Sequence, residues 1–148
     1  MGTAANPPLL PLRLHHQQPD LLRLLDELCS SGRAAEAHHR ASLLLLSTAS
    51  RLDARAANAI LRRLLRARTP LLTLRLVQAA AIVPSLPNHN RLLGLLCRAD
   101  PPPIPVLLAH RLHLRMRVPP NAASYAAILD GYARVPDPRA AQKLLIPG

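Results

Sequence analysis

The clearest pattern of apolar and polar positions lies between Pro120 and Leu145. Its first half carries apolar side chains at i, i+3, i+4 and i+7, namely Tyr125, Ile128, Leu129 and Tyr132. This spacing predicts a helix with one apolar face. Gly131 falls in its last turn, and Pro136 and Pro138 mark the break. A second apolar stripe follows at Ala140, Ala141, Leu144 and Leu145. The stretch therefore predicts a helical hairpin that needs neighbours to bury its apolar side.

The same four-position pattern occurs three more times upstream. It is formed by Leu21, Leu24, Leu25 and Leu28, by Ala57, Ile60, Leu61 and Leu64, and by His89, Leu92, Leu93 and Leu96. The residue after each leading position is Leu22, Asn58, Asn90 or Ala126, so the steps are 36, 32 and 36 residues. A period near 35 with two helices per unit is typical of a helical solenoid. We expect an all-α chain of three full repeats (18–53, 54–85, 86–121) and one incomplete repeat (122–148).

Local signals place the remaining helices. Asp20 and Asp53 are suited to cap helices, and the pattern predicts helices at Leu21–Cys29, Ala34 to about Leu46, and Leu71–Ala81. In the third repeat, Pro101, Pro102, Pro103 and Pro105 delay the second helix to near Val106.

Three stretches resemble one known family. Residues 28–37, LCSSGRAAEA, resemble the LC-x-x-GR-x-x-EA turn of pentatricopeptide repeats, and residues 124–132, SYAAILDGY, resemble their TYN-x-LI-x-GY helix. Residues 88–97, NHNRLLGLLC, are a looser match, and residues 119–121 stand where the family often has Pro-Asp. The related tetratricopeptide repeat is a poorer match because this chain has no Trp or Phe. The resemblance covers roughly residues 18 to 145. It departs from the family in the 32-residue second repeat and in the proline run of the third.

The resemblance implies a non-enzymatic plant protein that binds single-stranded RNA, with each repeat reading about one base. The implied base-facing residues are those after the leading position and those at the repeat junctions, namely Asn58, Asn90, Asp53, Ser85 and Asn121. Asn58 with Ser85 and Asn90 with Asn121 form polar pairs, whereas Leu22 and Ala126 cannot hydrogen-bond to a base. An alternative role for both asparagines is that of an ordinary polar residue near a helix start. Arg55, Arg62, Arg91 and Arg98 are the candidates for phosphate contact, although the sequence does not place them on one face.

Charge fits that interpretation. The net charge is +11, and 18 of the 19 basic residues are arginine. Between Ala54 and Ala99 there are eight arginines and no acidic residue. A positive field of this density favours a polyanion such as RNA, although a GC-rich gene also produces such a composition. With at most two repeats able to read a base, we expect weak, salt-sensitive RNA binding.

The sequence shows no sign of catalysis or of a bound metal or cofactor. The eight carboxylates form no paired constellation, phosphate-binding glycine loops are missing, and there is no C-x-x-C. His110 and His113 lie one turn apart with only Cys97 nearby, fewer ligands than a zinc site needs. The zinc signature of RNA-editing deaminases is also missing. Cys29 and Cys97 are expected to be unreactive, buried thiols.

Three further expectations concern the context of the chain. Residues 1–17 are acid-free and fit either a disordered leader or a weak transit peptide for the mitochondrion or, alternatively, the chloroplast. Leu71–Val83 is too short, and with Arg75 too polar, to span a membrane. Implied partners are RNA and other RNA-processing proteins, with no small-molecule substrate, and the implied role is organellar RNA processing or editing. A protein–protein scaffold and a truncated fragment without activity of its own are the alternatives.

Overall fold

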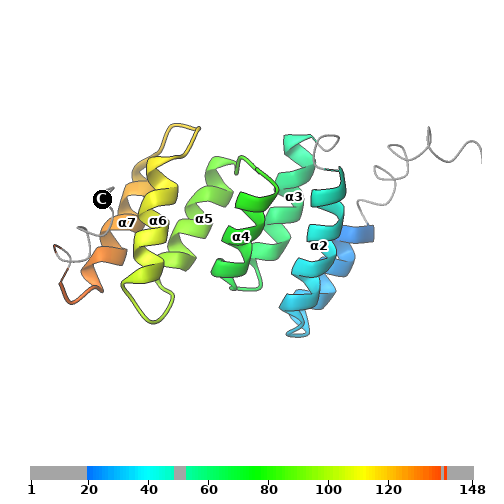
Figure 1. Ribbon diagram of the computed structural model, residues 1–148, viewed down its shortest axis with the longest axis horizontal. Coiled ribbons are helices and arrows are strands. Elements are labelled where there is room, and N and C mark those ends of the chain that lie inside the picture. The colour runs from blue at the N-terminus through cyan, green and yellow to red at the C-terminus, as the bar shows by residue number, and fades with distance from the viewer. Residues whose placement is uncertain (1–19, 49–52, 138, 140–148) are drawn as a thin grey trace, which may run out of the picture.

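The fold is a single run of helices joined by short loops (Figure 1). The computed structural model describes residues 20–48, 53–137 and 139, and those residues contain no strand. A first helix over residues 20–30 is followed by α2 (Ala34–Thr48), α3 (Ala54–Leu65), α4 (Pro70–Ala79), α5 (Leu86–Cys97), α6 (Ile104–Leu114) and α7 (Ala122–Ala133). This is the predicted all-α solenoid of helical hairpins, so the prediction of the fold is confirmed.

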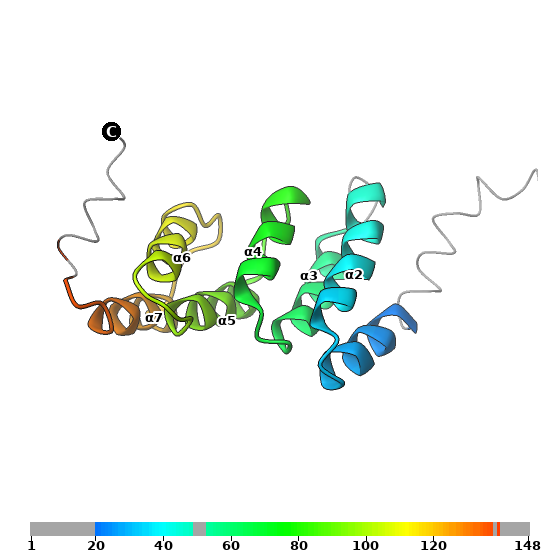
Figure 2. The same cartoon turned by 60° about the horizontal axis from the view of Figure 1, so that its bottom comes forward.

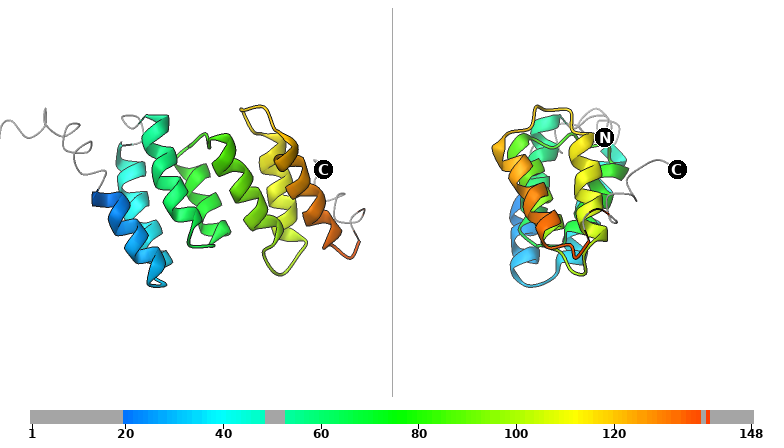
Figure 3. Two further views of the ribbon diagram at one scale, coloured as in Figure 1. Left: turned by 180° about the vertical axis from the view of Figure 1, so that it is seen from behind. Right: turned by 90° about the vertical axis from the view of Figure 1, so that its left-hand side faces the viewer.

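The helices lie in two rows. The first helix, α3, α5 and α7 form one row, and α2, α4 and α6 form the other (Figure 2). Seen from behind, the first row runs across the front, and seen from the end the two rows face each other (Figure 3). Each hairpin contributes one helix to each row, so residues with the same place in successive repeats lie side by side along the solenoid.

Each described helix of the first row after residues 20–30 begins at a side-chain cap. Asp53 accepts a hydrogen bond from the Ala56 amide at 2.7 Å and caps α3. Ser85 caps α5 through the Asn88 amide at 3.4 Å. Asn121 forms a capping box with Ser124 at the start of α7. The three predicted junction residues are therefore helix caps, which satisfy amides that have no partner within the helix.

Small differences from the sequence-based helix limits have local causes. The α6 helix begins at Ile104 rather than near Val106, because Pro105 lies in its first turn, where a missing N–H costs nothing. The first helix already includes Asp20, expected as its cap, and runs to residue 30. The second apolar stripe of the last repeat, from Ala140 to Leu145, and the leader at 1–17 lie outside the described residues.

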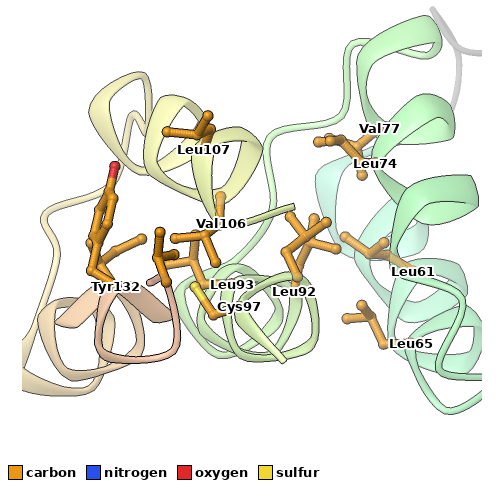
Figure 4. Packing of buried hydrophobic residues seen from close by; sticks show 14 residues of the cluster. Leu61, Leu65, Leu74, Val77, Leu92, Leu93, Cys97, Val106, Leu107 and Tyr132 are labelled. Carbon is orange, nitrogen blue, oxygen red and sulfur yellow. The ribbon is translucent and has the colours of Figure 1, made fainter. Parts of the chain in front are cut away.

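The core is mainly aliphatic and falls into two clusters, each of which spans neighbouring repeats. One cluster joins α3 to α7 and includes Leu61, Leu92, Val106 and Tyr132 (Figure 4). A second cluster joins the first helix, α2 and α3 and includes Leu25, Leu45 and Ile60. Each helix thus buries its apolar stripe against its neighbours, as expected of a repeat array.

The predicted apolar faces are buried to different extents along the chain. All four stripe residues of α5 are buried, including His89 and Leu92. In α7, Ile128 and Tyr132 are buried, whereas Tyr125 and Leu129 are 53% and 70% exposed. The four stripe residues of α7 are therefore not buried as one face. Ile128 and Tyr132 belong to the core cluster, whereas Tyr125 packs edge-on to the His113 ring of α6 and stays half exposed.

Polar contacts add to the packing between repeats. Asp26 of the first helix forms ion pairs with Arg63 and Arg66 of α3, each at 3.1 Å. In the other row, the buried His38 of α2 hydrogen-bonds to Thr73 of α4 at 3.0 Å. Among the described residues, no helix is long and apolar enough to cross a membrane.

Candidate nucleic-acid interface

Asn58 lies at the junction between the second and third repeats, and protein groups saturate its amide. Its Oδ1 accepts hydrogen bonds from the Ser85 amide at 2.7 Å and from Asn88 Nδ2 at 2.9 Å. Its Nδ2 donates to the Ala54 carbonyl at 2.9 Å and to the Val83 carbonyl at 3.1 Å. A side-chain amide has two N–H donors and two acceptor lone pairs. The structure therefore brings the predicted pair Asn58 and Ser85 together, and it leaves Asn58 no spare hydrogen-bonding group.

Asn90 occupies the equivalent place one repeat later, and its amide is only half used. Its Nδ2 donates to Asn121 Oδ1 at 2.9 Å, and its Oδ1 accepts from the Ser124 hydroxyl at 2.5 Å. Within the described part of the chain, one N–H and one lone pair of this amide have no partner. The predicted pair Asn90 and Asn121 is thus also in contact. Unlike Asn58, Asn90 can still accept or donate a hydrogen bond to a ligand.

The remaining predicted positions have fewer groups that could hydrogen-bond to a ligand. Asp53 is exposed, with its carboxylate engaged in capping α3. Leu22 is half-buried against the second core cluster. Ala126 is exposed and has no polar side-chain group. The two asparagine junctions are therefore the polar part of this face.

Two grooves run beside the asparagines along the first row of helices. The α3–α5 groove has a volume of about 530 Å³, and its lining includes Asn58, Arg55, Arg62, Arg66 and Arg91. The α5–α7 groove has a volume of about 820 Å³, and its lining includes Asn90, Arg68, Arg91 and Arg98. Arg91 lines both. The four arginines that the sequence could not place on one face all lie around these two adjoining grooves.

The two grooves differ in charge. None of the residues that line the α3–α5 groove is acidic. Asp100 and Asp130 line the α5–α7 groove, and Asp100 is engaged with Arg134 at 2.8 Å. The α3–α5 groove is therefore the more electropositive of the two, whereas the α5–α7 groove holds the asparagine with free hydrogen-bonding groups.

Three arginines stand at equivalent places, each at the C-terminal cap of a first-row helix. Arg66 ends α3, Arg98 ends α5 and Arg134 ends α7. Arg66 and Arg134 are tied to Asp26 and Asp100 at 3.1 and 2.8 Å. Arg98 has no ion pair within the described ranges. Its guanidinium is therefore the member of this set that is not already neutralised by a neighbour.

The histidine and cysteine side chains have structural surroundings. His110 Nδ1 hydrogen-bonds to the Tyr132 hydroxyl at 2.6 Å, and His113 packs its ring edge-on to Tyr125. Burial raises the pKa of the Cys97 thiol to about 11, and burial also raises the pKa of Cys29. A thiol of raised pKa is a poor nucleophile. In residues 20–48, 53–137 and 139, no group of three or more His, Cys, Asp or Glu side chains is arranged to hold a metal ion.

Sequence reasoning missed two residues of this face. Asn88 and Ser124 each lie three positions after a cap, where they contact both that cap and the asparagine of the preceding repeat. The signal for both was the capping pattern, since the third helical residue often reaches back to the cap. These two residues decide how much of each asparagine amide is left free.

Replacing Asn58 by alanine is expected to destabilise the fold by about 1–2 kcal/mol. The change leaves the partly buried Ser85 amide without its side-chain acceptor and removes one of the two acceptors of Asn88 Nδ2, which keeps its bond to the Asn58 carbonyl. An unsatisfied buried group has a cost of this order. Urea unfolding followed by circular dichroism measures the effect. Asn90→Ala is the matched control, because it removes fewer hydrogen bonds. An equal loss of stability in the two variants would contradict the finding that Asn58 is saturated and Asn90 is only half used.

Comparison with known proteins identifies a relative among plant proteins. Over 114 residues, the chain is 39% identical to a pentatricopeptide repeat-containing protein of Arabidopsis thaliana, and the match takes in 72% of this chain and 16% of the relative. The chain thus spans about a sixth of that relative's length. No family model matches the chain, and no solved structure does. The relative belongs to the pentatricopeptide repeat proteins, the family that the motifs at residues 28–37 and 124–132 resemble.

Proposed function

We propose that this chain binds single-stranded RNA along the face formed by α3, α5 and α7. The observation that supports it best is the pair of adjoining grooves, which together gather six arginines around two repeat-equivalent asparagines. Arginine suits phosphate because its planar fork donates two parallel hydrogen bonds. The two grooves share Arg91, so one strand can follow both without leaving the positive surface.

The two grooves would then have different roles. The α3–α5 groove has four arginines, no acidic lining residue and a saturated amide, so it would hold the RNA backbone without reading sequence. In the α5–α7 groove, Asn90 has a free N–H and a free lone pair, and Asn121 stands beside it. An amide of this kind can donate to and accept from the edge of one base. This arrangement supports one base-reading position, at Asn90. Asn58 would instead hydrogen-bond to the backbone of the protein.

The wider role is also a proposal. The family resemblance favours a part in organellar RNA processing or editing, in the mitochondrion or alternatively the chloroplast, without catalysis by this chain. With one reading position and few phosphate contacts, the chain alone would bind RNA weakly. Affinity would fall steeply with added salt, because binding to phosphate releases counterions.

Arg91→Ala is expected to weaken single-stranded RNA binding more than any other single arginine change. Arg91 lines both grooves, so its loss removes backbone contacts on both sides of α5. For single strands, each lost contact should reduce the slope of log affinity against log salt by about 0.7. Fluorescence anisotropy with labelled single-stranded RNA pools at several salt concentrations measures both quantities.

Arg75→Ala is the matched control, since Arg75 is an exposed arginine of α4 that lines neither groove. Asn90→Ala should leave the salt slope unchanged and reduce the difference between RNA pools of different base composition. If Arg91→Ala and Arg75→Ala weakened RNA binding equally, the binding would be explained by general charge attraction. Equal affinity for duplex DNA and single-stranded RNA would contradict the proposal.

A further inference from the structure

A third pocket lies between α4 and α6, in the other row of helices. It has a volume of about 350 Å³ and is bounded by α4, α6 and the loops that follow each of them. The pocket exists because α4 packs on α2, α3 and α5, whereas α6 packs on α5 and α7. Figure 2 shows α4 and α6 standing apart in their row. The pocket is therefore built by the hairpin arrangement and is separate from the two arginine grooves.

The floor of this pocket is apolar. Val77 and Ile82 lie on one side, and Leu108 and Leu112 of α6 lie on the other. His89 closes the base with 1% of its surface exposed, and burial lowers its pKa to about 4, so it is uncharged at neutral pH. A pocket of this size and lining accepts one or two large apolar side chains.

The rim of the pocket is positively charged and adaptable. Arg111, Arg115 and Arg117 surround the floor, and none of the lining residues is acidic. Met116 lies between the last two arginines, and its unbranched thioether can adjust to the shape of a bound group. An apolar floor inside an arginine rim is complementary to an apolar group that carries negative charge beside it.

We propose that the α4–α6 pocket binds a short segment of a partner protein in which one or two large apolar residues are flanked by aspartate or glutamate. The apolar side chains would enter the floor, and the carboxylates would pair with the arginine rim. The segments of this chain that lie outside the described residues do not fit that description. Residues 1–19, 49–52 and 140–148 contain no acidic residue, and they carry Arg13, Arg51 and Lys143.

RNA is a poorer match to this pocket than an acidic peptide. Phosphates gain nothing from an apolar floor, and single-stranded bases are held mainly by stacking on aromatic rings. The lining has no Phe, Tyr or Trp. The pocket and the RNA face would therefore bind different partners on opposite rows of the same solenoid.

The test is a titration of the full chain with two labelled peptide pools. Both pools carry two leucines in a short segment, flanked by aspartate and glutamate in one pool and by lysine in the other. We expect the acidic pool to bind and the basic pool not to bind. Arg115→Glu and Met116→Asp should each weaken binding of the acidic pool by at least about tenfold. Arg115→Glu replaces a positive charge of the rim with a negative one, and Met116→Asp places a negative charge between Arg115 and Arg117. Arg115 is the C-terminal cap residue of α6 and Met116 follows it in the α6–α7 loop, so both substitutions lie outside the helix interiors.

Arg75→Glu makes the same change in net charge on α4, outside the pocket, and should alter peptide binding by less than about twofold. Equal weakening by Arg75→Glu and Arg115→Glu would overturn the proposal, as would a lack of preference for the acidic pool. Displacement of the peptide by single-stranded RNA would also overturn it, because the pocket would then be part of the RNA face. RNA affinity is measured separately on the same proteins. A negative result with the peptides would therefore leave the proposal of RNA binding untouched.

Discussion

Gly131→Ala is expected to lower the free energy of unfolding by about 3 kcal/mol, whereas Gly94→Ala is expected to raise it by up to about 1 kcal/mol. Both glycines lie inside helices of the first row, where alanine is normally the better helix former. The two changes should therefore have the same sign if helix propensity decided the outcome. The structure predicts opposite signs because the surroundings of the two residues differ.

At Gly131, α7 lies against α5 with no room for a side chain. A methyl group added there would lie 2.6 Å from Cys97 Sγ, 2.8 Å from Cys97 Cβ and 3.3 Å from Val106 Cγ1. Cys97 is buried, and its Cβ cannot rotate out of the way. The helices would have to separate, at the cost typical of an overpacked core. A methyl group added at Gly94 meets nothing within 4 Å, so only the gain in helix propensity remains.

Urea unfolding of the two variants and the parent chain measures both effects. Adding Cys97→Ala to Gly131→Ala should recover part of the loss, because it removes the sulfur contact and leaves the Cβ contact. A coupling of that kind identifies neighbours that touch. A neutral or stabilising Gly131→Ala would show that α5 and α7 do not approach as closely as the structure indicates.

This pair of glycines shows where sequence-based prediction ends. Helix positions and the repeat period followed from local patterns, because apolar spacing at i, i+3, i+4 and i+7 recurs at every repeat. Gly94 and Gly131 have similar local sequence, each inside an apolar helix near a Cys or Tyr. What separates them is a contact between residues 34 positions apart in the chain, and only the packed structure contains it.

The candidate RNA face shows the same limit. The family resemblance paired Asn58 with Ser85 and Asn90 with Asn121, and the members of each pair are in contact in the structure. The resemblance could not predict that Asn58 is saturated, because two of its four partners are the Val83 carbonyl and the Asn88 side chain. Equivalent positions thus have different chemistry. The α4–α6 pocket could not be predicted from the sequence either, because it depends on the distance between two hairpins.

A second large effect is expected on acidification, through the histidines between α5, α6 and α7. His89 of α5 lies 6.4 Å from His113 of α6, measured between ring centroids, and it is almost fully buried. Burial, with a smaller contribution from His113, lowers the pKa of His89 from 6.5 to about 4. Burial and His113 also lower the pKa of His110.

The direction of the effect follows from proton binding. Above pH 6.5, His89 is neutral in the folded and unfolded chains. Between pH 6.5 and about 4, the unfolded chain binds a proton that the folded chain does not, so stability falls as the pH falls. A shift of this size corresponds to a loss of about 3 kcal/mol, complete near pH 4. His110 adds to the loss in the same direction.

His89→Leu isolates this contribution. The change keeps a buried group of similar size, and it removes an imidazole whose Nε2 has no hydrogen-bond partner among the described residues. We expect urea unfolding of His89→Leu to depend much less on pH between 6.5 and 4 than unfolding of the parent chain. His39→Gln, an exposed histidine of α2, should keep the parent's pH dependence. All other ionisable groups except the substituted histidine are the same in the three proteins, so effects common to them cancel in the comparison. If His89→Leu and the parent lost stability equally over this range, protonation of His89 would not be what loosens the packing of α5 against α6.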